Sequence, residues 1–305
     1  MPDLLGISSS ALTAVDQWLS TTSHNISNVN TPGYSRETVN LSAKHPTLMG
    51  NQFVGNGVQV DSVKREYNTF LTNNVWGTTA QQGQAQTLSD MATQVDNLLA
   101  NSTTGLSPTL DKFFTAAHGV ANDPTSAGAR QQVLSTGETV VQTFQMLSTQ
   151  MQGIGNNVNT LMTTQVTQIN NLASSIAKYN VNIATDTAKT DGLGSPNDLA
   201  DSRDEAVRQL SAIVGVNVFQ QPDGTLNVSI GNGQNLVAGS QVRYLNVVNN
   251  PYDPAQNEVA LGDSANAADP ANVKAHVTAV NPASSSAERN PAARHRYTPF
   301  RGPIG

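Results

Sequence analysis

The chain has 305 residues and a formal net charge of −6, and only 12% of its residues are charged and 5% aromatic. This length is enough for about two domains. A composition so poor in charged and aromatic side chains is not typical of a compact enzyme. Binding to nucleic acid phosphates requires clustered Lys and Arg, so the mild acidity argues against nucleic acid as a partner.

The absence of cysteine removes three kinds of chemistry at once. With no Cys in the sequence, the chain can form no disulfide, thiol nucleophile or thiolate metal site. No apolar run approaches the ~18 residues that a membrane span requires, so we expect no membrane partner. The first basic residue is Arg36, so no positively charged region opens a cleavable secretory signal. We therefore expect a cytosolic chain, or one exported without cleavage of a signal.

Residues 1–33 form the first predicted unit, a coiled-coil-like helix. Its apolar residues recur at alternating spacings of three and four, which is typical of a narrow helical packing stripe. The apolar members of this stripe are Leu5, Leu12, Val15, Leu19, Ile26 and Val29. Asp3 and Asp16 are the only carboxylates before Arg36, so we expect the helix to pack on other helices in an assembly. Pro32 and Gly33 should end it.

Residues 34–66 are predicted to be extended. Val39 and Leu41 alternate with polar residues, and so do Val58 and Val60. Such alternation indicates short strands, although a long loop is also compatible with it.

Residues 67–214 are predicted to form an elongated bundle of long helices. Helical periodicity resumes at Tyr67, and Ser107-Pro108 is a typical helix start. A second stripe of three-and-four spacings then extends far beyond the length of an ordinary globular helix; with its flanks it predicts about 60 residues, or ~90 Å. Part of this stripe should be an ordinary intramolecular core. The residues expected to pack are Val141, Phe144, Met151, Val158, Met162, Ile169, Leu172, Ile176, Tyr179 and Ile183.

Residues 215–280 are predicted to form a small antiparallel β-domain. Residues 216–219 and 226–230 alternate like strands around the turn sequence Pro222-Asp223-Gly224, which predicts a hairpin. Residues 281–305 are rich in Arg and Pro without apolar periodicity, so we expect them to be disordered. The predicted fold class is mainly α with a small antiparallel β-domain.

No pattern in the chain predicts catalysis. The five His residues are scattered without metal-ligand spacing, so we expect no metal site. An acidic run at Asp198, Asp201, Asp204 and Glu205 lacks the spacing of a calcium loop and is explained by the dipole of a helix start. Asp204 and Arg208 should form an exposed pair four residues apart. We find no nucleophile with a base and expect no catalytic residue, cofactor or small-molecule ligand.

One segment resembles a known family. Residues 23–36 resemble the N-terminal signature of bacterial flagellar axial proteins, which rod, hook and hook-associated proteins share; His24 stands where Asn is usual. The signature residues are Asn25, Asn28, Asn30, Thr31, Pro32, Gly33 and Tyr34. Two later blocks, at 55–71 and 195–224, resemble the hook-associated proteins of the hook–filament junction. Together the likeness covers residues 1 to 245.

The resemblance implies a structural subunit of the bacterial flagellum. It implies export in unfolded form by the flagellar type III apparatus and an extracellular place in a short ring between hook and filament. The implied partners are the hook protein, the next hook-associated protein and further copies of the chain. The N-terminal helix would lie in the inner tube, the long helices in the middle layer and the β-domain outside.

The end of the chain departs from the family pattern. Members of this family end with a second set of long helices and a C-terminal amphipathic helix, which pair with the N-terminal ones. We therefore expect a truncated or frame-shifted chain whose stripes at 5–29 and 141–183 lack their usual partners, so that it self-associates or frays.

Two alternatives have less support. Another type III-exported helical protein, of the needle-tip or translocator kind, has no reason to carry the Thr-Pro-Gly-Tyr block, and a hydrolase of the flagellar axis would need a catalytic cluster.

Overall fold

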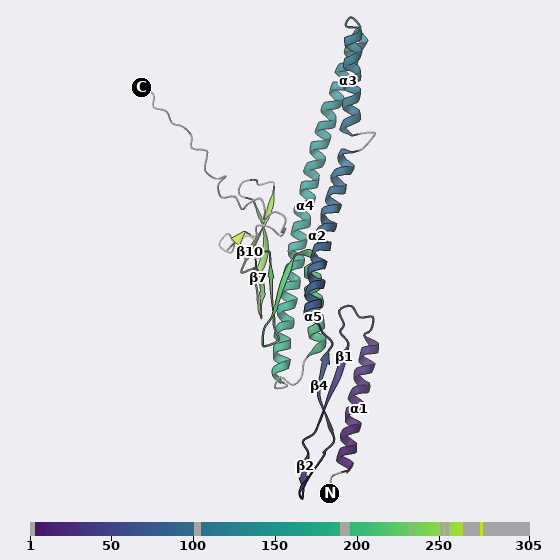
Figure 1. Ribbon diagram of the computed structural model, residues 1–305. Helices are drawn as coiled ribbons and strands as arrows, with labels where there is room; N and C mark the ends of the chain where they lie inside the picture. The colour runs from purple at the N-terminus through teal and green to yellow at the C-terminus, as the bar shows by residue number, and fades with distance from the viewer. Residues whose placement is uncertain are drawn as a thin grey trace, which may run out of the picture.

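The computed structural model describes residues 4–100, 105–189, 196–231, 233–250, 253, 256–264 and 275–276. The protein is elongated (Figure 1). A helix and a long hairpin lie at one end, a body of long helices runs to the other end, and a β-domain lies against the side of that body. The segment 281–305, expected to be disordered, lies outside the described residues.

The N-terminal unit is one helix packed on a two-stranded sheet. Helix α1 (Leu4–Ser27) lies along β1 (Glu37–Ala43) and β4 (Val58–Arg65), which are antiparallel and pair Glu37 with Arg65. Strands β2 (Thr47–Met49) and β3 (Gln52–Val54) extend the connection between them as a second small hairpin. Residues 34–66 thus contain strands as well as loops, which settles the alternative that the sequence left open.

Small side chains let α1 approach the sheet closely. The helix buries Ser10, Ala14 and Thr21 on this side, and Ser10 Oγ accepts a hydrogen bond from the Val58 amide at 3.3 Å. Gly57 has a φ of +91°, and any Cβ there would collide with the Ser10 hydroxyl. The face of α1 that touches its own chain is therefore the small, polar one.

The helical body consists of α2 (Thr69–Leu99), α3 (Leu106–Asn122), α4 (Ala127–Lys189) and α5 (Asn197–Ile213). Helix α4 has 63 residues, which confirms the expected single long helix and gives it a length of about 95 Å. Helix α3 packs on its first half, and α5 packs between α4 and α2 at the other end. The expected cap at Ser107 is wrong: α3 begins at Leu106, and Gly105 precedes it without a side-chain cap.

The β-domain contains two antiparallel sheets. The first has the order β5 (Val216–Gln220), β6 (Leu226–Ile230), β7 (Gln234–Ala238) and β8 (Gln241–Val242). The second has β11 (Ala275–His276), β10 (Asn257–Gly262) and β9 (Tyr244–Asn249) in that order. The predicted hairpin is present, with Val216 opposite Ile230 and a turn at Gly224, whose φ is +81°.

The main core lies where the second half of α4 and helix α5 meet the two sheets of the β-domain. Its fully buried large side chains include Ile176, Val207, Leu210, Val228, Ile230, Leu236, Val237 and Leu245. Apolar area removed from water here is the largest stabilising contribution that a fold of this kind can gain.

The long stripe of α4 is covered in only one of its halves. Ile169, Ile176 and Ile183 are buried, and Met162, Leu172 and Tyr179 are half-buried. Val141, Phe144, Met151 and Val158 are exposed, contrary to the expectation of packing.

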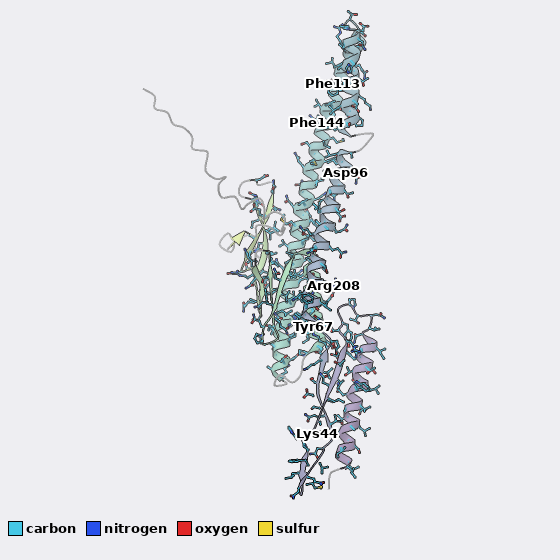
Figure 2. The ribbon with its side chains drawn as sticks, in the orientation of Figure 1. Lys44, Tyr67, Asp96, Phe113, Phe144 and Arg208 are labelled. Carbon is cyan, nitrogen blue, oxygen red and sulfur yellow. The ribbon has the colours of Figure 1, made fainter. Side chains whose placement is uncertain are left out.

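The reason is that α3 packs on a different face of α4. The half-buried residues there include Val133, Gly137 and Val140, and Phe113 lies over Gly137. Figure 2 shows Phe113 and Phe144 in this upper part of the body. The packed face is thus displaced from the expected stripe by about one residue.

Candidate assembly surface and its anchor on the helical body

Helix α1 exposes large apolar side chains on the face that its own sheet does not cover. Leu5 is 82% exposed and Ile26 is 68% exposed. The other exposed members of the stripe are Leu12, Val15, Leu19 and Val29, and Trp18 beside it is exposed as well. A surface helix normally buries its large apolar residues and exposes polar ones. An exposed apolar surface with this reversed arrangement marks an interaction site.

Asn25 fixes the chain where it leaves α1. Its Oδ1 accepts hydrogen bonds from the Tyr34 hydroxyl and from the Glu37 amide, each at 2.8 Å. Its Nδ2 donates to the Glu37 carbonyl at 2.9 Å. Because the Asn amide has an acceptor oxygen and a donor nitrogen on separate atoms, it can accept both bonds and donate the third, which a single hydroxyl could not arrange in this geometry.

The other signature residues shape the turn that follows. Asn28 Nδ2 donates to the His24 carbonyl at 3.2 Å, and Thr31 Oγ1 donates to Asn28 Oδ1 at 3.1 Å. Gly33 has a φ of +81°, and a Cβ there would lie 2.8 Å from Cβ of Glu205 on α5. Asn30 and Pro32 lie at the exposed surface of the turn. The signature therefore builds a compact turn that touches α5.

A largely buried ion cluster joins this unit to α5. Arg65 Nη1 lies 2.9 Å from Asp201 Oδ1 and 2.7 Å from Asp204 Oδ2. The second oxygen of Asp201 accepts the Ser35 amide at 2.7 Å. The guanidinium of Arg65 also lies 4.2 Å from the ring centre of Tyr67, a cation–π contact.

Burial and charge act against each other in this cluster. Burial raises the pKa of Asp204, although Arg65 and Arg203 act to lower it. Burial lowers the pKa of Arg203, which lies 3.5 Å from Asp204. For Arg65, burial would lower the pKa, but the two carboxylates outweigh it and raise the pKa. Arg65 therefore stays charged, and its positive charge holds the carboxylates of Asp201 and Asp204 together.

These contacts correct the interpretation of the acidic run. Asp201 and Asp204 bind Arg65 rather than serving a helix dipole, and Asp198, in the first turn of α5, lies 3.2 Å from His24 Nε2. The expected pair of Asp204 with Arg208 is wrong, because Arg208 binds Glu205 at 2.7 Å.

Sequence reasoning missed the residues that join the units of the chain. Asn197 on α5 donates to Glu37 Oε1 at 2.7 Å and to the Val63 carbonyl at 3.1 Å. On α4, Asn170 donates to the carbonyl of Leu245 and accepts from its amide, both at 2.8 Å. A signal did exist: Asn170 lies on one helix face with Val166, Ala173 and Ala177, and a polar side chain on an apolar face needs partners when that face is buried.

Asn180 is the second anchor of the β-domain. It is fully buried on α4 and donates to the carbonyls of Leu226 and Gly239, both at 2.8 Å. Its Oδ1 accepts the Leu226 amide at 3.0 Å and lies 3.3 Å from Arg203 Nη1. Four hydrogen-bonding partners therefore meet at one amide group.

An open groove of about 450 Å³ lies between the signature turn and helices α4 and α5. His24, Tyr34, Tyr179, Asp198 and Glu205 are among the residues that line it. Across the part of the chain that the structure describes, no three acidic or His side chains gather to hold a metal ion. None of the described helices combines the length and the apolar character needed to cross a bilayer.

Comparison with known proteins identifies the family. Residues 92–279 match the family described as the flagellar hook-associated protein FlgK helical domain, and residues 5–34 match the flagella basal body rod protein family. The chain belongs to the FlgK family of flagellar hook-associated proteins. This confirms the resemblance inferred from the signature and the two later blocks, and the mainly α fold with antiparallel sheets agrees with it.

Several FlgK relatives are similar over most of this chain. The flagellar hook-associated protein 1 of Salmonella typhimurium is 37% identical over 265 residues, covering 87% of this chain and 48% of the relative. The Escherichia coli K12 protein of the same name is 35% identical over 263 residues, covering 86% of this chain and 48% of its own length. The chain thus spans about half the length of these relatives.

A solved FlgK structure is also similar. The flagellar hook junction protein FlgK from Burkholderia pseudomallei superposes with a TM-score of 0.59 at 29% identity. The match covers 68% of this chain and 36% of that one.

Proposed function

We propose that this chain is a structural subunit of the bacterial flagellum at the junction between hook and filament, and that it carries out no catalysis. The observation that carries the proposal is the exposed apolar stripe of α1, in a chain of the FlgK family. The N-terminal unit is held on the body by polar contacts of Ser35 and Arg65, while the large apolar side chains of α1, such as Leu5, are exposed.

In this proposal the α1 stripe is the main assembly surface. Its partners are the hook protein, the next hook-associated protein and further copies of this chain in a ring. Each Leu that passes from water into such an interface contributes about 1.5–3 kcal/mol. The near absence of charge on α1 avoids the cost of burying unpaired charges there.

The remaining units take the outer layers. Residues 1–33 would line the inner tube, 67–214 would form the middle layer and 215–280 would face outward, with 34–66 as the connection. The exposed residues Val141, Phe144, Met151 and Val158 form a second apolar surface on α4. In the assembled flagellum this surface would pack on further long helices.

We also propose that the chain leaves the cell through the flagellar type III apparatus and works outside it. The sequence contains no Cys, so the chain can pass the apparatus unfolded and needs no oxidative folding afterwards.

The test is negative-stain imaging of hooks isolated from cells that lack their junction protein. Adding the purified chain should produce extra density at hook tips. The full-length Salmonella relative serves as the positive control. Bare tips with this chain beside decorated tips with the relative would contradict the proposal for this chain. Bare tips with both proteins would contradict docking at the hook tip for the relative as well.

A further inference from the structure

The small hairpin of β2 and β3 exposes an apolar pair that no described part of the chain covers. Leu48 and Phe53 are cross-strand partners, 58% and 73% exposed. The Asn56 side chain binds Thr47 and donates to the His45 carbonyl at 3.0 Å, which stiffens the base of this hairpin. Residues 44–57, here called the hairpin tip, contain no carboxylate, and Lys44 is their one lysine.

The first half of α1 offers a matching surface. Leu5, Leu12 and Asp16 lie close to one line along the helix, because the eleven-residue step from Leu5 to Asp16 makes just over three turns. All three are exposed. Asp16 is the one carboxylate between residues 4 and 35. Its side chain and that of Lys44 form no ion pair with any other described residue.

The spacing of apolar and charged groups agrees on the two surfaces. From Leu5 to Asp16 the helix rises about 16 Å. From Leu48 to Lys44 the chain leaves β2, and four extended residues would span about 13 Å; the flexible Lys side chain reaches over the difference. The tip and the start of α1 lie at the same end of the molecule, and both run along its length (Figures 1 and 2, with Lys44 labelled in Figure 2).

We propose that the hairpin tip of one copy packs on the first half of α1 in a neighbouring copy. Leu48 and Phe53 cover Leu5 and Leu12, and Lys44 pairs with Asp16. The partner is a second copy of this chain, beside the first and in the same orientation, as in a ring; the inference therefore rests on the proposed function. It assigns to the tip the role of setting the spacing between copies.

Cross-linking tests this contact directly, because a chain without Cys gives disulfides only at introduced positions. Untagged Phe53→Cys is mixed with a longer, tagged copy carrying Leu5→Cys, and both are added to hooks under mild oxidation. The matched control carries Ile26→Cys, which is exposed on the same stripe about 30 Å away. We expect at least five times more heterodimer with Leu5→Cys. Equal yields for the two positions at decorated hook tips would overturn the proposal.

Charge reversal is an independent test. Lys44→Glu should raise the protein concentration needed to decorate half of the hook tips about twofold to fivefold, as expected for an ion pair at the edge of an interface. The double variant Asp16→Lys with Lys44→Glu should restore it. Lys64→Glu, at an exposed position on β4, should have no effect.

These outcomes separate this inference from the proposed function. Unmodified chain that decorates hooks, together with Lys44→Glu and double variants that bind equally well, would remove the tip contact and leave the junction role standing. Unmodified chain that leaves hooks bare would overturn both.

Discussion

Arg65 and Asp204 are 139 positions apart in the sequence, yet Arg65 Nη1 lies 2.7 Å from Asp204 Oδ2. The first residue ends β4 and the second lies on α5, so the contact joins the N-terminal unit to the helical body. The neighbouring contacts between these units are also polar, at Ser35 and Asn197. Directional polar contacts set the angle of this joint more narrowly than apolar packing alone would.

Replacing Arg65 with Met should destabilise the chain strongly. The change removes the cation that Asp201 and Asp204 share and leaves Asp204 with only Arg203, at 3.5 Å; breaking a buried pair in this way costs about 3–5 kcal/mol. Urea unfolding followed by circular dichroism measures the loss. Arg208→Met is the control, because its pair with Glu205 is more exposed and should contribute less than about 1 kcal/mol. Equal losses for the two variants would show that the cluster does not stabilise the fold.

Replacing Gly33 with Ala should open the joint locally. The residue combines a φ of +81° with a Cβ position 2.8 Å from Glu205 Cβ, so strain and collision act together. We expect a loss of about 2–3 kcal/mol and faster proteolysis within residues 24–37.

Gly50→Ala is its matched control. Gly50 has a φ of +63° but open space around it, so only the backbone strain of about 1 kcal/mol remains. If the two variants unfold at the same denaturant concentration, the contact of Gly33 with α5 does not contribute to the free energy of unfolding.

Asn180→Ala should loosen the β-domain from α4. The change leaves the carbonyls of Leu226 and Gly239 and the Leu226 amide without their partner in a buried site, at about 1–3 kcal/mol for each unsatisfied group. Hydrogen exchange at the Leu226 amide should accelerate at least tenfold. Asn171→Ala, exposed on the same helix, should leave this exchange unchanged. Unchanged exchange in Asn180→Ala would mean that the sheet docks by apolar contact alone.

Periodicity predicted the elements well because it reports local structure. The 63-residue α4 and the hairpin pairing Val216 with Ile230 both follow from spacing along a short stretch of chain. Periodicity could not predict that Val140 rather than Val141 faces α3. The two helix faces, which differ by one residue in register, are similarly apolar, so the sequence does not show which one is covered.

The joint was beyond prediction for a different reason. The partners of Asp201 lie 136 and 166 residues away in the sequence, and no local pattern in α5 predicts which residues they are. The acidic residues of α5 are equally compatible with a helix dipole until the position of β4 is known.

Thr225→Val should raise the pKa of Asp223 toward its ordinary value of 3.8. In the native turn the Thr225 hydroxyl, and after it the Thr225 amide, donate to Asp223 Oδ1 and lower this pKa. A lowered pKa means that Asp223 adds a small stability above pH 3.8, which is lost as the pH falls through its folded pKa. Carboxyl titration by NMR measures the shift. The same pKa in both proteins would show that the hydroxyl does not bind the carboxylate in solution.

Replacing Leu5, Leu12 and Leu19 together with Ser should separate assembly from folding. All three are exposed in the single chain, so the substitutions should change its unfolding free energy by less than about 1 kcal/mol. Buried in an interface, each would contribute about 1.5–3 kcal/mol, so their loss should weaken binding to hook tips at least 100-fold. Phe219→Ser, at an exposed position on β5, should bind normally. A triple variant that is folded and still decorates hooks at the normal concentration would show that α1 assembles through another face.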